Sequence, residues 1–184
     1  MRWSLVIVIA CTVVGCSGSV ERDDRPAFTV DPGQPFRLEF GRGSGWHGLN
    51  TVKLDHTGRV VLHRLKSERR EDVTILSWEV ATLQLSPEVL AEVLKAVESN
   101  NLMGLHKAYH EDIADGTQWV LWIKQGEGEK SVYFNNSFPK AIRAFAEQLD
   151  AVLARAGLGT AAWQPVPDRE SGQHERELWD SIKR

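Results

Sequence analysis

Cysteine is nearly absent from this chain. Its 184 residues include two cysteines, both within the first sixteen positions, so the remainder has no disulfide and must be held by its own hydrophobic core. Long apolar runs are absent after residue 14, which excludes a later membrane-spanning helix of about 20 apolar residues. Basic residues are not in excess, because 22 Lys and Arg stand against 25 Asp and Glu. We therefore expect no nucleic-acid partner, since nucleic-acid binders present a clustered basic surface.

The first sixteen residues combine a positive start, an apolar stretch and a terminal cysteine. Arg2 precedes the apolar residues 5–14, and Val13-Val14-Gly15-Cys16 closes the segment. A stretch of this length is too short for a permanent membrane helix and is typical of a removable signal. We predict a signal peptide over residues 1–15.

This segment resembles the signal of bacterial lipoprotein precursors. Val13-Val14-Gly15-Cys16 is similar to the lipobox of that family, in which an aliphatic residue, a tolerant position and a small residue precede the cysteine. The resemblance implies that Cys16 becomes the first mature residue and carries a covalent diacylglycerol, which anchors the protein to a membrane of the cell envelope on its extracytoplasmic side. Ser17 stands where proteobacterial lipoproteins kept at the inner membrane usually carry Asp, so the periplasmic face of the outer membrane is favoured if this sorting applies. The alternative is a plain secretory signal with an incidental cysteine.

Residues 16–34 are predicted to be the lipidated cysteine and a flexible tether. The segment is rich in Ser, Gly, Pro and charge, and Phe28 and Val30 are its main apolar residues. A flexible coil of this length has an end-to-end distance of about 25 Å. Such a tether would hold a domain clear of the lipid headgroups.

Alternating apolar and polar residues predict strands from residue 35 onward. Phe36, Leu38 and Phe40 alternate with charged residues, and Gly58 lies in a turn where it is free to adopt a positive φ. The run 73–85 is apolar on both faces, which is typical of a central strand that is covered on two sides. The predicted strands cover residues 36–40, 52–55, 60–62, 73–85, 119–124 and 131–135.

Helical periodicity replaces the strand pattern at two places. Ser86-Pro87-Glu88 supplies a hydroxyl cap, a proline and an acid in the first turn of a predicted helix. A second helix follows Pro139, and Gly157 is placed just past its end. The resulting order ββββαββα predicts an α+β domain over residues 35–157, with an antiparallel sheet of about six strands and two helices packed on one face.

Residues 158–184 are predicted to be a proline-containing linker and a short, charged helix. Leu178, Trp179 and Ile182 lie within about one turn of each other on that helix. A helix this short is marginal alone in water. We predict that it is mobile in the isolated protein and serves as a contact element; docking on the domain's own sheet is the alternative.

The order of these elements resembles a family of uncharacterised domains in bacterial envelope lipoproteins. The resemblance covers Phe36 to Gly157 and includes Asp115-Gly116 before the second hairpin. The family has no assigned reaction, so the resemblance implies only a fold and an envelope location.

A polar segment between the first helix and the second hairpin contains the best metal candidates. Two histidines four residues apart share a face if this stretch is helical, and nearby carboxylates can complete a zinc site. The spacing departs from the known zinc-protease motif, and a solvated connector is the alternative. The candidate ligands are His106, His110, Glu111, Asp112 and Asp115.

Aromatic residues in exposed segments are the candidate binding residues. Trp46 and His47 lie in a glycine-rich loop between the first two predicted strands, and binding residues often lie in such loops on a rigid sheet. Trp179 lies in the C-terminal helix, where a core position, a partner surface and a membrane interface are all open to it.

These observations favour a lipid-anchored envelope protein whose domain is a non-enzymatic binding module. Its partner would be another envelope protein or an envelope polymer. One alternative is a small metal-dependent hydrolase that uses zinc bound by the cluster from His106 to Asp115. The other is a structural envelope lipoprotein without a specific ligand.

Overall fold

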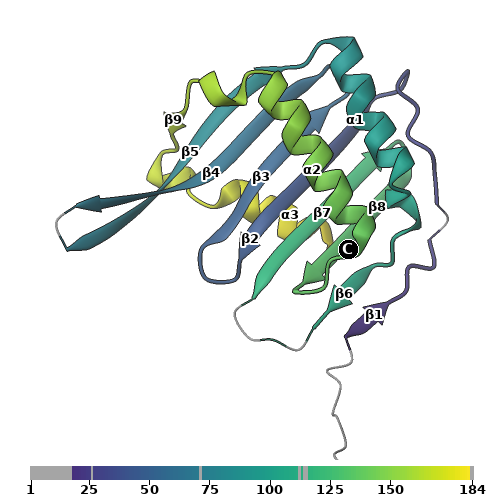
Figure 1. The fold of residues 1–184 in the computed structure, drawn as a ribbon, viewed down its shortest axis with the longest axis horizontal. Coiled ribbons are helices and arrows are strands. Elements are labelled where there is room, and N and C mark those ends of the chain that lie inside the picture. Colours follow the sequence, from purple (N-terminus) through teal and green to yellow (C-terminus); the bar gives the residue numbers. More distant parts are fainter. Residues whose placement is uncertain (1–17, 26, 71, 112, 114–115, 183–184) are drawn as a thin grey trace, which may run out of the picture.

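The protein folds as one sheet with helices on both faces (Figure 1). The computed structural model describes residues 18–25, 27–70, 72–111, 113 and 116–182. The strands of this part of the chain form a nine-stranded sheet in the order β1-β6-β8-β7-β2-β3-β4-β5-β9. The strands are β1 (Ser19–Glu21), β2 (Phe36–Ser44), β3 (Gly48–Asp55), β4 (Arg59–Arg70), β5 (Val73–Gln84), β6 (Ala108–His110), β7 (Thr117–Gln125), β8 (Gly128–Asn135) and β9 (Gln164–Pro165), and the α-helices are α1 (Pro87–Ser99), α2 (Lys140–Arg155) and α3 (Gln173–Ile182).

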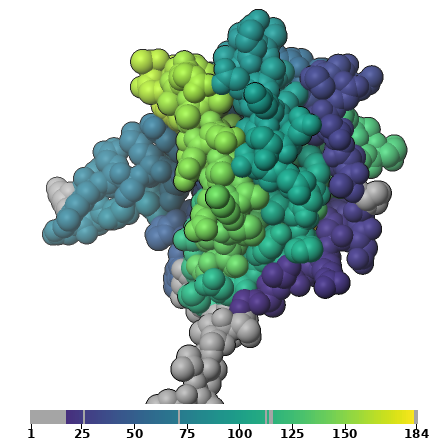
Figure 2. All heavy atoms as spheres, turned by 45° about the vertical axis from the view of Figure 1, so that its right-hand side comes forward, coloured from purple at the N-terminus to yellow at the C-terminus, as the bar shows by residue number. Residues whose placement is uncertain are grey.

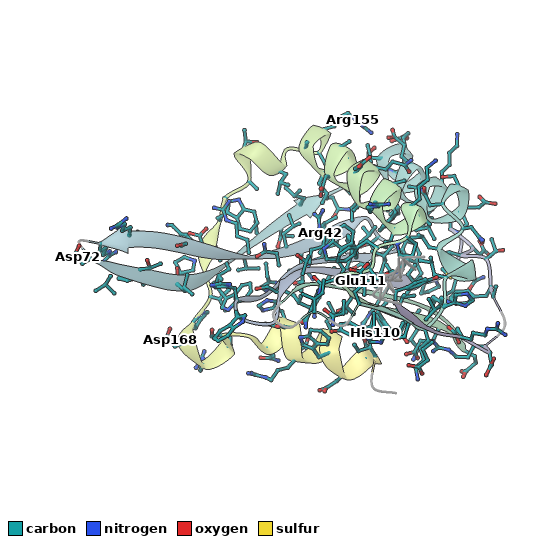
Figure 3. All side chains as sticks on the ribbon, turned by 60° about the horizontal axis from the view of Figure 1, so that its bottom comes forward. Arg42, Asp72, His110, Glu111, Arg155 and Asp168 are labelled. Atoms are coloured by element: carbon teal, nitrogen blue, oxygen red, sulfur yellow. The ribbon has the colours of Figure 1, made fainter. Side chains whose placement is uncertain are left out.

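The prediction of a six-stranded antiparallel sheet with two helices is wrong. The sheet is mixed, because β6 runs parallel to β8, and β1, β6 and β9 add strands that were not predicted. These three strands are 3, 3 and 2 residues long, too short to show an alternating pattern. A third helix, α3, lies on the face of the sheet opposite to α1 and α2 (Figure 3).

The main core lies between the sheet and the helices α1 and α2, on what we call the front face. Phe36, Leu38 and Phe40 of β2 all point into it and are almost fully buried. Full burial of such a side chain contributes about 2 kcal/mol. Helix α1 begins as predicted, because the Ser86 hydroxyl accepts a hydrogen bond from the backbone N–H of Val89. No helix in the described part of the chain is long and apolar enough to cross a membrane.

Helix α3 covers the other side of the sheet, the back face. Leu178 is fully buried there against Leu49 of β3 and Val120 of β7. Gly41 of β2 permits the close approach, because a Cβ at this position would lie 2.6 Å from the Leu178 side chain. The structure therefore places the C-terminal helix in a small core of its own, in agreement with the alternative of docking on the domain's own sheet and against the prediction of a mobile contact element.

The segment predicted as a tether lies along the domain where the structure describes it. Strand β1 pairs with β6, which places Ser19 opposite His110. Phe28 and Val30 pack against the main core. Through these contacts, residues that precede Pro35 are part of the folded unit.

Strands β4 and β5 extend beyond the rest of the sheet as a two-stranded arm (Figure 2). The arm comprises residues 66–70 and 72–77, and Asp72 lies at its tip (Figure 3). Residues 66–70, for which no strand was predicted, therefore belong to β4. The run that follows it is not central and covered, since Ile75 and Leu76 are exposed on opposite faces of the arm.

Candidate functional site

A groove of about 800 Å³ opens on the front face, between the end of α2 and the strands beneath it. Ligand sites in proteins commonly measure about 300–1,000 Å³. Arg42, Asn50 and Arg64 contribute polar side chains from β2, β3 and β4, and Trp163 contributes an aromatic wall. We call this feature the arginine groove.

Arg42 is held at the α2 side of the arginine groove. Its guanidinium donates two hydrogen bonds to Asp150, with N–O distances of 2.8 and 2.5 Å, and lies 5.3 Å from the centre of the Phe40 ring. Figure 3 shows Arg42 between the helix layer and the sheet. Half of the Asp150 side chain is accessible to solvent, so the ion pair is worth at most about 1 kcal/mol. A carboxylate or phosphate of a ligand can therefore compete with Asp150 for this arginine.

Arg64 lies on the opposite side of the groove and is held by two partners. Its guanidinium stacks 3.9 Å from the centre of the Trp163 ring and donates to Glu79 over N–O distances of 3.0 and 2.7 Å. Lys66 lies 3.2 Å from the same carboxylate. The hydrogen bonds from Arg64 hold the pKa of Glu79 below its usual value. The Glu79 carboxylate therefore holds two cations, Arg64 and Lys66, beside the groove.

Strand register brings these residues together. Arg42 lies opposite Asn50, and Arg64 lies opposite Glu79. The Asn50 side chain accepts a hydrogen bond from the backbone N–H of Leu65, with an N–O distance of 2.7 Å. The arginine groove was missed by the sequence reasoning. One feature of the sequence indicates it: the alternation of inward-facing apolar residues that ends at Phe40 continues with a polar residue, Arg42, at the next inward-facing position.

The metal candidates do not lie on a helix. His110 belongs to strand β6, which overturns the helical spacing on which the prediction was based. The centre of the His106 ring lies 5.9 Å from that of Tyr109, and the centre of the His110 ring lies 5.2 Å from that of Tyr133. Asp112 and Asp115 lie outside the described residues. Within the ranges that the structure describes, no three His, Cys, Asp or Glu side chains are grouped as metal ligands.

The candidate binding residues occupy two different surfaces. Trp46 is 72 % exposed in the β2–β3 loop, and the neighbouring His47 contacts the Ser44 hydroxyl at 3.3 Å. Trp179 is half-buried on the back face, where its indole N–H donates to Glu175 at 3.0 Å. The predicted lipidation site Cys16 lies outside the described residues. The structure thus brings neither Trp46 nor Trp179 to the arginine groove.

Two histidines that are far apart in the sequence meet on the back face. The rings of His63 and His174 stack in parallel with their centres 4.1 Å apart, and the edge of Trp78 contacts His174. Burial lowers the pKa of both histidines to about 4. At neutral pH both imidazoles are therefore uncharged, and this cluster acts as part of the packing between α3 and the sheet.

No protein-family model matches the chain, and a comparison with curated proteins finds no match either. The resemblance to envelope lipoproteins therefore stays a prediction.

Proposed function

We propose that this protein is a lipid-anchored component of the bacterial cell envelope whose domain binds an anionic envelope polymer in the arginine groove. The anchor is supported by the sequence Val13-Val14-Gly15-Cys16 after a short apolar stretch. Two acyl chains on one cysteine suffice for stable membrane attachment. If the sorting rule of Gram-negative bacteria applies, the periplasmic face of the outer membrane is the favoured location, since Ser17 and not Asp follows the cysteine.

The observation that carries the binding proposal is the presence of two arginines, Arg42 and Arg64, in the lining of one groove of ligand size. Arginine binds carboxylates and phosphates through two parallel hydrogen bonds. Asp150 already occupies this position on Arg42, and an incoming anion makes the same contacts when it displaces this exposed carboxylate. Arg64 is oriented by Glu79 and Trp163 before any ligand arrives, which lowers the entropic cost of binding.

Lipidation is tested by replacing the acylated residue. Cys16→Ser removes the thiol, and no later cysteine is present to replace it. Metabolic labelling with a clickable fatty acid is expected to mark the wild type and not Cys16→Ser. Equal labelling of the two chains would contradict the anchor.

Ligand binding is tested with the full lipidated chain in detergent. The carboxylate-bearing probe is purified peptidoglycan, and the phosphate-bearing probe is lipopolysaccharide. Arg42→Ala is expected to weaken binding of the true ligand about tenfold, the equivalent of one charge-assisted hydrogen bond of about 1.4 kcal/mol. Arg64→Ala should have a similar effect.

Arg143→Ala is the matched control, because Arg143 is exposed on α2 and does not line the groove. The probe that responds to the groove variants identifies the ligand as carboxylate or phosphate. Binding that is unchanged in both groove variants, or equally weakened by Arg143→Ala, would show that the arginine groove is not the site.

A further inference from the structure

The described part of the chain begins at one edge of the sheet, where strand β1 starts. Strand pairing places Ser44 beside Gly48 and Thr117, and it places Ser19 opposite His110. The ends of β2, β8 and β6 and the starts of β3, β7 and β1 therefore lie at the same edge, as Figure 1 shows. We call it the entry edge.

The exposed apolar side chains are concentrated at this edge and on the arm. Trp46, in the β2–β3 loop, is 72 % exposed, Val20 of β1 is 50 % exposed and Ile113, just after β6, is 52 % exposed. The other large hydrophobic side chains that are exposed in the described chain, Val73, Ile75 and Leu76, belong to the arm. The turns at the opposite edge, 56–58 and 126–127, carry none of them.

The entry edge is also tied closely to the predicted lipidation site. Gly18 lies against the carbonyl of His110, since a Cβ on Gly18 would come within 3.0 Å of that oxygen. Cys16 is two residues earlier, and two residues span at most about 7 Å. A diacylated Cys16 therefore cannot hold the entry edge far from the lipid headgroups.

We propose that the entry edge rests on the bilayer surface, with the Trp46 side chain in the headgroup interface. This inference depends on the lipid anchor proposed above. Tryptophan favours the membrane–water interface, because its ring is apolar and its N–H remains able to hydrogen-bond. The described edge also contains the acidic Glu111, so the contact relies on apolar side chains and does not require anionic lipid.

This orientation places the arginine groove beside the membrane. Gly43 and Thr117 line the groove, and both are at or next to strand ends of the entry edge. A polymer that binds Arg42 is then held close to the lipid surface. The domain thereby acts as a short bridge between the membrane and its ligand.

The test uses the lipidated full chain in phosphatidylcholine vesicles that contain bromine-labelled lipid. With Cys16 acylated, His47→Cys introduces a single free thiol next to Trp46, and an environment-sensitive fluorophore on that thiol reports contact with lipid. The matched control is Glu127→Cys, an exposed position in the β7–β8 turn at the opposite edge. We expect a blue shift and loss of emission for the label at residue 47, and neither for the label at residue 127.

Trp46→Ser in the His47→Cys chain is expected to reduce both signals, since the anchoring ring is gone. Equal emission at the two labelled positions would show that the domain does not contact the bilayer. A blue shift at residue 47 without quenching by lipid would show that a second copy of the chain covers this edge. Either result overturns the proposal. Flotation with the vesicles reports the anchor separately, so a failure of lipidation is distinguishable from a free edge.

Discussion

His63 and His174 are the residues through which acid is expected to destabilise the back face. A histidine in the unfolded chain titrates near pH 6.5, whereas burial lowers the pKa of both residues to about 4 in the folded protein. Between these values the unfolded chain binds more protons than the folded chain, so the free energy of unfolding falls as the pH decreases from about 6.5 to about 4. Above that window the two histidines contribute no pH dependence. Lys53 lies nearby and also lowers both pKa values.

His174→Phe is expected to flatten this dependence, because one of the two imidazoles no longer takes up a proton on unfolding. Melting temperatures are measured between pH 4 and pH 7.5, and the slope of melting temperature against pH is compared between the variant and the wild type. His56→Phe, at an exposed turn, is the control and should retain the slope of the wild type. An unchanged slope in His174→Phe would remove His174 from the explanation.

Asp23 and Lys130 form a buried ion pair that fastens the N-terminal segment to β8. The two charged atoms are 3.0 Å apart, both side chains are almost fully buried, and the Lys130 ammonium also donates to the Leu105 carbonyl. Asp23→Ala leaves that ammonium without its counter-charge and is expected to cost about 3 kcal/mol. Urea unfolding measures the loss.

Replacing both partners by apolar residues, as Asp23→Leu with Lys130→Met, is expected to recover most of that stability, because Arg25, the other partner of Asp23, remains accessible to water and no fully buried charge is left unpaired. Asp24→Ala is the control, since Asp24 is exposed one position away. A double variant as unstable as Asp23→Ala would mean that side-chain shape at these positions, and not the unpaired charge, sets the cost.

Helix α3 behaves as a structural element of the domain, and Leu178 is its main contact. Leu178 is fully buried between Leu49 and Val120, so Leu178→Ala removes buried methyl groups and is expected to cost about 3 kcal/mol. Leu76→Ala is the matched control, because Leu76 is exposed on the arm. Differential scanning calorimetry compares the two. Equal melting temperatures would indicate that α3 contributes little to folding.

Elements with a local signal were predicted correctly from the sequence, and elements that depend on distant pairing were not. Ser86 caps α1, and Gly58 and Gly157 adopt positive φ values. Each of these conformations is determined by residues next to it in the sequence. Strand β6 could not be recognised, since a segment of this length becomes a strand only by pairing with both β1 and β8. The docking of α3 depends on Gly41, which is far from it in the sequence.

At the scale of the whole molecule, the arginine groove was beyond local reasoning for a similar reason. Arg42 and Arg64 line the same groove only because β3 lies between their strands in one register, and a shift of one residue would turn either side chain to the other face. Trp163 joins them after a chain reversal that follows α2. By contrast, the exposure of Trp46 could be predicted from the glycine-rich composition of its loop, and the structure confirms it.

The folded unit begins before Pro35. Residues 16–34 were predicted to be a tether, yet β1 pairs with β6, Asp23 neutralises Lys130 and Phe28 packs on the core. A chain that starts at Pro35 exposes that part of the core and leaves the Lys130 ammonium unpaired, so we expect a loss of at least about 3 kcal/mol relative to a chain that starts at Gly18. Urea unfolding of the two chains tests this, and it should also show a smaller denaturant dependence for the shorter chain, because less surface is exposed on unfolding. Equal midpoints would mean that the segment before Pro35 is a tether after all, and that the lipid anchor leaves the domain free to move away from the membrane.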